Sequence, residues 1–112
     1  MIILSLRPIY FDFIKSGKKT IEGRINSDKF KDLKIGDKLI FTTDHTSEQL
    51  ICVVKDFKTY PDFHSMLESE GIQNCLPGIT DLQEAVNIYE NLPGYKEKVK
   101  QFGALAIRIE CI

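Results

Sequence analysis

The chain has 112 residues, 43% of them hydrophobic, and a net charge of −1. That length predicts a single domain spanning 1-112, with enough apolar side chains for one core. The near-zero charge argues against a protein that is cationic throughout. Three cysteines without Cys-x-x-Cys spacing argue against a disulfide framework or a zinc site. We therefore expect neither a metal nor another cofactor.

Charge is distributed unevenly along the chain. Residues 15–38 carry eight basic and four acidic side chains, a local excess of +4. The rest of the chain carries seven basic and twelve acidic side chains, a local −5. A basic region on an acidic body can steer an anionic ligand such as RNA or a nucleotide toward the protein.

The first apolar run, 1–6, predicts a buried strand and is too short for a signal peptide or a membrane span. We therefore expect a cytoplasmic protein with reduced thiols and no membrane partner. A helix follows. Pro8 suits its first turn, Ile9 and Phe13 follow at helical spacing, and Gly17 favours its end.

A charged strand comes after this helix. Glu22 and Arg24 share one face because strand side chains alternate, and they lie about 7 Å apart along the backbone. Lys18 and Lys19 stand at the beginning of the strand. Together these side chains can hold an anion or a polar planar group beside an acid and a base. The alternative is a solvated strand edge whose ion pair contributes about 0–1 kcal/mol.

Two further runs, 38–42 and 50–57, predict strands joined by a hairpin connection at 44–47. Between the charged strand and these runs lies a polar stretch, 26–34, anchored by Phe30 and Leu33.

Helices are expected in the second half of the chain. Pro61 and Asp62 begin one that Gly71 ends, and the capping box Thr80-Asp81-Leu82-Gln83 begins another. A short lysine-rich helical turn at 95–101 precedes a closing strand at 104–112. About five strands and three helices in this mixed order predict an α+β fold with a mainly antiparallel sheet.

The spacing Gly-x-Lys-x-x-Glu-x-Arg, formed by Gly17, Lys19, Glu22 and Arg24, resembles the signature of the ASCH family, relatives of the PUA domain. The block from Leu33 to Phe41, Leu-Lys-x-Gly-Asp-x-x-x-Phe, fits the same family, and the resemblance covers nearly all of the chain. It implies a PUA-like small β-barrel of five to six strands with about three surrounding helices.

The resemblance also implies a role in RNA metabolism. In this interpretation the protein binds RNA or a nucleotide-like ligand in a cleft lined by the charged motif. Lys18, Lys19 and Arg24 would contact phosphate, and Tyr60 or Tyr95 would stack a base.

A hydrolase is the alternative. A lysine in a partly dry cleft can act as a base or nucleophile, so Lys19 and Glu22 are the candidate catalytic residues. The family includes a small amidohydrolase acting on N4-acetylcytidine, and members thought to cut RNA without a metal. The amidohydrolase has Thr where this chain has Glu22, and its catalytic Glu could correspond to Glu68, Glu70 or Glu84. A third possibility is a non-catalytic module that presents Glu84 and Glu90 to a protein partner.

Overall fold

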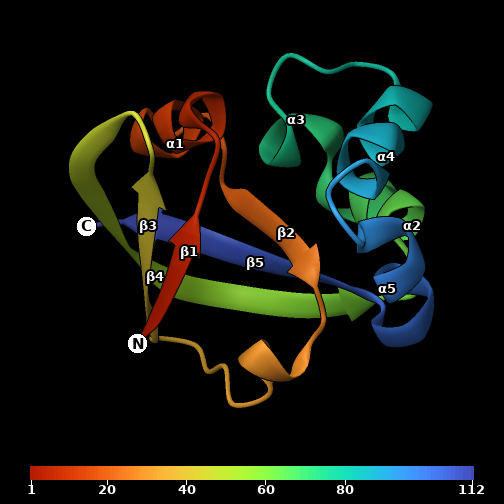
Figure 1. The fold of residues 1–112 in the computed structure, drawn as a ribbon, viewed down its shortest axis with the longest axis horizontal. Coiled ribbons are helices and arrows are strands. Elements are labelled where there is room, and N and C mark those ends of the chain that lie inside the picture. Colours follow the sequence, from red (N-terminus) through yellow and green to blue (C-terminus); the bar gives the residue numbers. More distant parts are fainter.

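Five strands form one curled sheet in the order β1-β3-β4-β5-β2 (Figure 1). The computed structural model describes all residues, 1–112. β1 runs parallel to β3, and every other neighbouring pair is antiparallel. The strands are β1 (Ile2–Ser5), β2 (Ile21–Ile25), β3 (Lys38–Thr43), β4 (Thr46–Tyr60) and β5 (Ala104–Cys111).

Helices surround the sheet (Figure 1). In this view α1 lies at the top, the 3-10 helix η1 lies at the bottom after β2, and the other four helices pack together on the right, beside β2 and the start of β5. The helices are α1 (Pro8–Lys15), η1 (Asp28–Phe30), α2 (Phe63–Glu70), α3 (Ile72–Cys75), α4 (Leu82–Glu90) and α5 (Tyr95–Phe102). None of them is long and apolar enough to cross a bilayer.

The expected α+β class and the number of strands are confirmed, with several local differences. β4 continues well beyond the predicted 50–57 run, because polar residues on its exposed flanks still pair with β3 and β5. There are five α-helices where about three were expected. The additional ones are α3, a single turn that begins directly after Gly71, and α5, which is a full helix where a turn was predicted.

The beginning of α4 also differs from the prediction. The capping residue is Asp81, whose carboxylate accepts a hydrogen bond from the Glu84 amide at 2.9 Å. Thr80 lies one residue outside the helix. Asp81 and Glu84 have the same spacing as the predicted box, so the sequence offered two overlapping signals and the acidic residue caps the helix.

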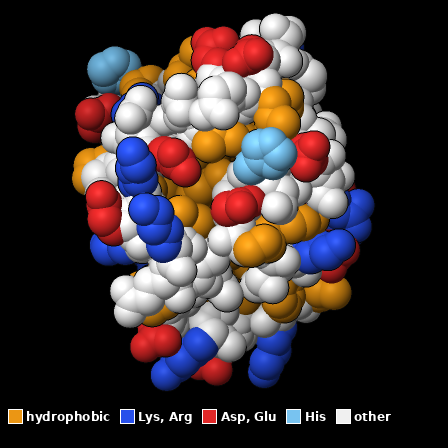
Figure 2. All heavy atoms as spheres, turned by 90° about the vertical axis from the view of Figure 1, so that its right-hand side faces the viewer, with side chains coloured by type: hydrophobic (Ala, Val, Ile, Leu, Met, Phe, Trp, Pro, Cys, Tyr) orange, Lys and Arg blue, Asp and Glu red, His pale blue; other side chains and the backbone are white.

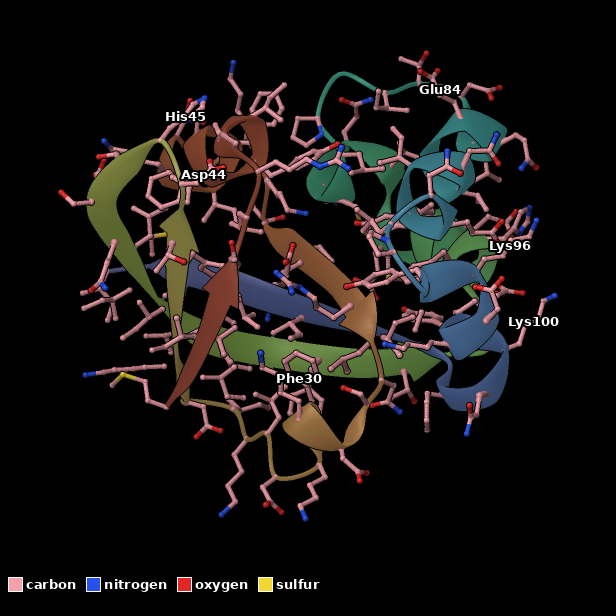
Figure 3. The ribbon with its side chains drawn as sticks, in the orientation of Figure 1. Phe30, Asp44, His45, Glu84, Lys96 and Lys100 are labelled. Carbon is pink, nitrogen blue, oxygen red and sulfur yellow. The ribbon has the colours of Figure 1, made fainter.

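β5 separates two hydrophobic cores. Leu105, Ile107 and Ile109 face the inside of the curled sheet together with α1 and Phe30. Ala104 and Ala106 face the four packed helices. The small alanine side chains let the helices approach that face closely, and the larger side chains fill the curl. Phe30, labelled in Figure 3, reaches this inner core from η1.

The curled sheet does not close through backbone pairing, because β1 and β2 are its two edge strands. Side chains bridge the gap instead. The Arg24 guanidinium on β2 donates to the Ser5 carbonyl on β1 at 3.0 Å, and Lys29 reaches the Ile3 carbonyl at 3.5 Å. We call this gap between β1 and β2 the seam.

Candidate ligand pocket at the seam

A pocket of about 210 Å³ opens at the seam, between the two edge strands and the helices α4 and α5. Lys19 and residues of β2 form its floor. The end of β1 and the start of α1 form one wall, and residues from the second half of the chain form the other. The residues that line it are Ser5, Leu6, Arg7, Tyr10, Lys19, Glu22, Gly23, Arg24, Leu76, Ile88, Tyr89, Leu92, Pro93 and Tyr95.

A buried carboxylate, that of Glu22, lies at the centre of the floor between two cations. Its Oε1 atom is 3.3 Å from Lys19 Nζ, and its Oε2 atom is 2.7 Å from Arg24 Nε. Glu22 and Lys19 are only 4% and 3% exposed. A surface ion pair, the alternative considered from the sequence, is therefore ruled out, and each cation neutralises part of a charge that would be costly to bury alone.

Three acceptors surround the Lys19 ammonium. In addition to Glu22, it donates to the carbonyl oxygens of Ile21 and Cys75, each at 2.6 Å. All three ammonium hydrogens are thus engaged, and the nitrogen has no lone pair to offer to a substrate in this arrangement. Because Cys75 belongs to α3, the bond to its carbonyl also connects α3 to the beginning of β2.

Arg24 is the more available cation. Its side chain is 20% exposed, and it donates to Glu22 and to the Ser5 carbonyl. Burial opposes its charge, but attraction to Glu22 and the hydrogen bonds with Glu22 and Tyr95 outweigh burial and raise the pKa of Arg24. The guanidinium is therefore a permanent charge at the pocket wall.

Three tyrosines line the pocket. Burial raises the pKa values of Tyr10, Tyr95 and, most strongly, Tyr89; Arg7 partly offsets this effect at Tyr10, and Arg24 at Tyr95. All three hydroxyls are therefore neutral near pH 7. Tyr89 and Tyr95 stack on Phe63 of α2, with ring centroids 4.6 and 5.9 Å away, and this stacking fixes their orientation.

The backbone of Gly23 adds a donor and an acceptor to the pocket. In the β2–β5 register the Asn26 amide bonds to Gly103, and the Ile109 amide bonds to Thr20. Hydrogen-bonded and non-hydrogen-bonded pairs alternate along such a ladder, so the N–H and C=O of Gly23 point away from β5 toward the seam. Any larger residue here would place its Cβ atom only 2.9 Å from Tyr89 Oη, which is too close for the two to coexist without movement.

Four of the predicted site residues meet in this pocket: Lys19, Glu22, Arg24 and Tyr95. Two do not. Lys18 is exposed and lines a separate, shallow hollow together with Phe13. Tyr60 donates its hydroxyl to Glu70 on a different part of the surface, with Lys58 over its ring.

None of the three later glutamates that were considered for the site lines the pocket. Glu70 is the acceptor for Tyr60, and Glu68 lies 3.5 Å from His64 on the exposed side of α2. Glu84 is in the first turn of α4 and points away from the sheet, as Figure 3 shows.

Sequence reasoning missed Arg7, Tyr10 and Tyr89 as lining residues. Arg7 and Tyr10 belong to the turn into α1 and its first turn, just before the charged motif in the sequence but outside its spacing pattern. Tyr89 belongs to the apolar face of α4, and its ring lies in the core. Its hydroxyl, however, is buried without a hydrogen-bond partner in the protein. The sequence carries no signal for that feature.

A second, smaller groove continues from the pocket past Arg24 and Tyr95, which line both. The groove also contains Ser27, Lys29 and Lys98. Basic residues from β2, from the segment after it and from α5 therefore form a continuous track with the pocket. No group of three His, Cys, Asp or Glu side chains lies close enough to hold a metal ion.

The family profile of the ASCH domain matches residues 4–112. The chain belongs to the ASCH domain family. Two solved structures resemble this ASCH domain closely. The hypothetical protein PH0355 is 37% identical, with a TM-score of 0.84 over 98% of this chain and 97% of its own. Protein PF0455 from Pyrococcus furiosus is 32% identical, with a TM-score of 0.77 over 99% and 96%.

A more distant structural relative is the ASCH protein from Zymomonas mobilis, at 16% identity and a TM-score of 0.65. The likeness covers 98% of this chain and 68% of that one, and at this identity it concerns the fold alone. The expected PUA-like fold is confirmed, as a five-stranded half-barrel. No curated protein gives a significant match to the chain.

Proposed function

We propose that this ASCH domain binds single-stranded RNA or a nucleotide-like ligand, with one base in the seam pocket. The pocket itself is the observation that carries the proposal. At about 210 Å³ it is smaller than typical drug-sized sites and suits a single planar ring system. Half of its lining residues are hydrophobic, and Tyr10 and Tyr95 add neutral hydroxyls.

Hydrogen-bonding groups in the pocket match the edge of a nucleobase. Gly23 supplies an N–H and a C=O next to each other on the free edge of β2. A base edge presents donors and acceptors side by side in the same way. The guanidinium of Arg24 adds a planar donor whose geometry suits a base edge or a phosphate.

Charge around the pocket favours an anionic ligand. Arg7, Lys19 and Arg24 face one carboxylate, that of Glu22, and the adjoining groove adds Lys29 and Lys98. A base in the pocket would place its phosphate toward this groove. The helical side of the molecule, by contrast, carries charges of both signs interspersed (Figure 2). So few cations predict weak, salt-sensitive binding.

A single strand fits this site better than a duplex. A base must leave its stack to enter a pocket at a sheet edge, and single-stranded RNA offers bases that are already unpaired. The cytoplasmic location expected from the sequence would give the protein access to such RNA.

Fluorescence anisotropy with short single-stranded and double-stranded RNA at two salt concentrations tests the proposal. Arg7→Ala should weaken single-strand binding several-fold and lower the salt slope by about one, because Arg7 makes no ion pair in the fold. Lys100→Ala is the matched control, since Lys100 points away from the pocket on the outside of α5 (Figure 3). Equal effects of the two substitutions, or equal affinity for the duplex, would contradict it.

We prefer binding to hydrolysis because all three hydrogens of the Lys19 ammonium are engaged and each oxygen of Glu22 already contacts a cation. Hydrolysis by these two residues remains a prediction of the family resemblance. Incubation with a panel of acylated nucleosides and single-stranded RNA, followed by mass spectrometry, separates the two functions. The hydrolase would be favoured if the wild-type protein forms a product and a folded Glu22→Gln variant forms none.

A further inference from the structure

Two of the three cysteines face each other across β4 and β5. Cys52 and Cys111 are direct partners in the antiparallel register. The next pair, Ile51 and Ile112, is hydrogen-bonded through the Ile112 amide at 2.9 Å. Hydrogen-bonded and non-hydrogen-bonded pairs alternate, so the cysteines form a non-hydrogen-bonded pair, the type with Cα atoms about 4.5 Å apart and adjacent side chains on one face. Disulfides span Cα separations of about 4.4–6.8 Å.

The two thiols differ in accessibility. Cys52 is fully buried in the inner core, and Cys111 is half-buried at the edge of that core. The Cys111 thiol donates to the Ile14 carbonyl, with 3.8 Å between sulfur and oxygen. Burial, and then the hydrogen bond with Cys111, raise the pKa of Cys52. Cys111 is therefore the thiol that a reagent in solution meets first.

Cys75 is different from both. It lies in the other core, between the helices and β5, and its thiol has no cysteine opposite it. Burial raises the pKa of Cys75 to about 12. It is the internal comparison for any reaction at the pair, because a reaction governed by unfolding would reach all three cysteines.

We propose that Cys52 and Cys111 are a redox modification site that forms a disulfide between β4 and β5. With a small disulfide as the oxidant, Cys111 thiolate attacks one of its sulfurs and releases one thiol. Cys52, after losing its proton, then attacks the Cys111 sulfur and releases the second thiol. Two cysteine thiols are oxidised, and the small disulfide is reduced to two thiols.

The bond would fasten the end of β5 to the middle of β4. It would close a long loop that contains all four helices of the second half of the chain. A cross-link of this kind restricts the unfolded chain and thereby stabilises the folded one. The proposal is independent of the RNA-binding function and of the seam pocket.

The test treats the folded, full-length protein with glutathione disulfide, followed by acid quenching and tryptic digestion without reduction. The expected product has lost the mass of two hydrogens, and residues 39–55 are joined to residues 109–112. Residues 59–96, which contain Cys75, stay unmodified. A reducing agent should reverse the change, and the oxidised protein should melt at a higher temperature than the reduced one.

Cys111→Ser is the matched control, because serine keeps a donor for the Ile14 carbonyl and cannot form the bond. Its melting temperature should not respond to glutathione disulfide. If Cys111→Ser fails to fold, Cys52→Ala replaces it as the control. In Cys52→Ala the reaction should stop at a glutathione adduct on Cys111. A persistent glutathione adduct on Cys111 of the wild-type protein, or no reaction at all in the folded state, would overturn the proposal.

Discussion

Glu22 holds two cations in place at the pocket floor with a single side chain. Its two oxygens contact Lys19 and Arg24 separately, so its loss leaves both charges without their counter-ion. This makes Glu22 a structural residue of the pocket whether or not a reaction takes place there.

We expect Glu22→Gln to lower the free energy of unfolding by about 3 kcal/mol, because it leaves Lys19 buried beside a neutral amide. Urea denaturation followed by circular dichroism measures the change. The matched control is Glu48→Gln, which breaks an exposed pair with Lys15 and should change stability little. Similar effects of the two substitutions would show that the buried pair contributes no more than the exposed one.

Tyr89 presents the opposite case, a buried hydroxyl without a partner. Tyr89→Phe removes the unsatisfied group and keeps the ring stacked on Phe63, so it should raise stability by about 1 kcal/mol. Tyr95→Phe is the comparison, because the Tyr95 hydroxyl contacts Arg24 and its loss should lower stability. Thermal denaturation of the ligand-free variants measures both changes. A lower stability of both Tyr89→Phe and Tyr95→Phe would mean that the Tyr89 hydroxyl has a hydrogen-bond partner in solution.

At the level of elements, α4 depends on the side chain that caps it. Asp81 accepts from the Glu84 amide, and Thr80 makes no such bond. We expect Asp81→Ala to cost about 1 kcal/mol and Thr80→Ala to be close to neutral. Urea midpoints of the two variants give the answer. The reverse order would place the beginning of the helix one residue earlier, where the sequence pattern alone suggested it.

Much of the fold was predictable because each element carries a local signal. Pro8, Asp62 and the alternation in β5 are such signals, and the structure has elements at each of them. The surroundings of the charged motif were less predictable. Lys19 binds the Cys75 carbonyl 56 residues away, and the Arg24 guanidinium meets the end of β1. Contacts of this kind depend on how the sheet curls, and no spacing along the chain encodes them.

On the scale of the whole molecule, the buried tyrosines and cysteines determine how stability responds to alkaline pH. Burial raises the pKa values of Tyr10, Tyr89, Tyr95, Cys52 and Cys75 in the folded state. The unfolded chain releases these protons at lower pH than the folded one. Their contribution to stability is therefore complete below about pH 9 and is lost as the pH rises through the folded values.

We accordingly expect the urea midpoint to fall steadily above about pH 9, whereas it changes little between pH 7 and 8. Tyr89→Phe should make the fall shallower, since it removes the tyrosine whose pKa burial raises most clearly. An identical slope in the variant would mean that Tyr89 titrates normally. Measurement in reducing buffer keeps the proposed disulfide out of the comparison.

The position of β5 between the two cores has a consequence for how the protein is made. Each core uses one face of this strand, and β5 is the last element along the chain. During translation, the helices and the first four strands leave the ribosome before the strand that completes either core. Neither core can therefore become stable before β5 is made, and the nascent chain folds only after residues 104–111 are synthesised. Until β5 is synthesised, the apolar side chains that pack on its two faces have no partner strand to bury them.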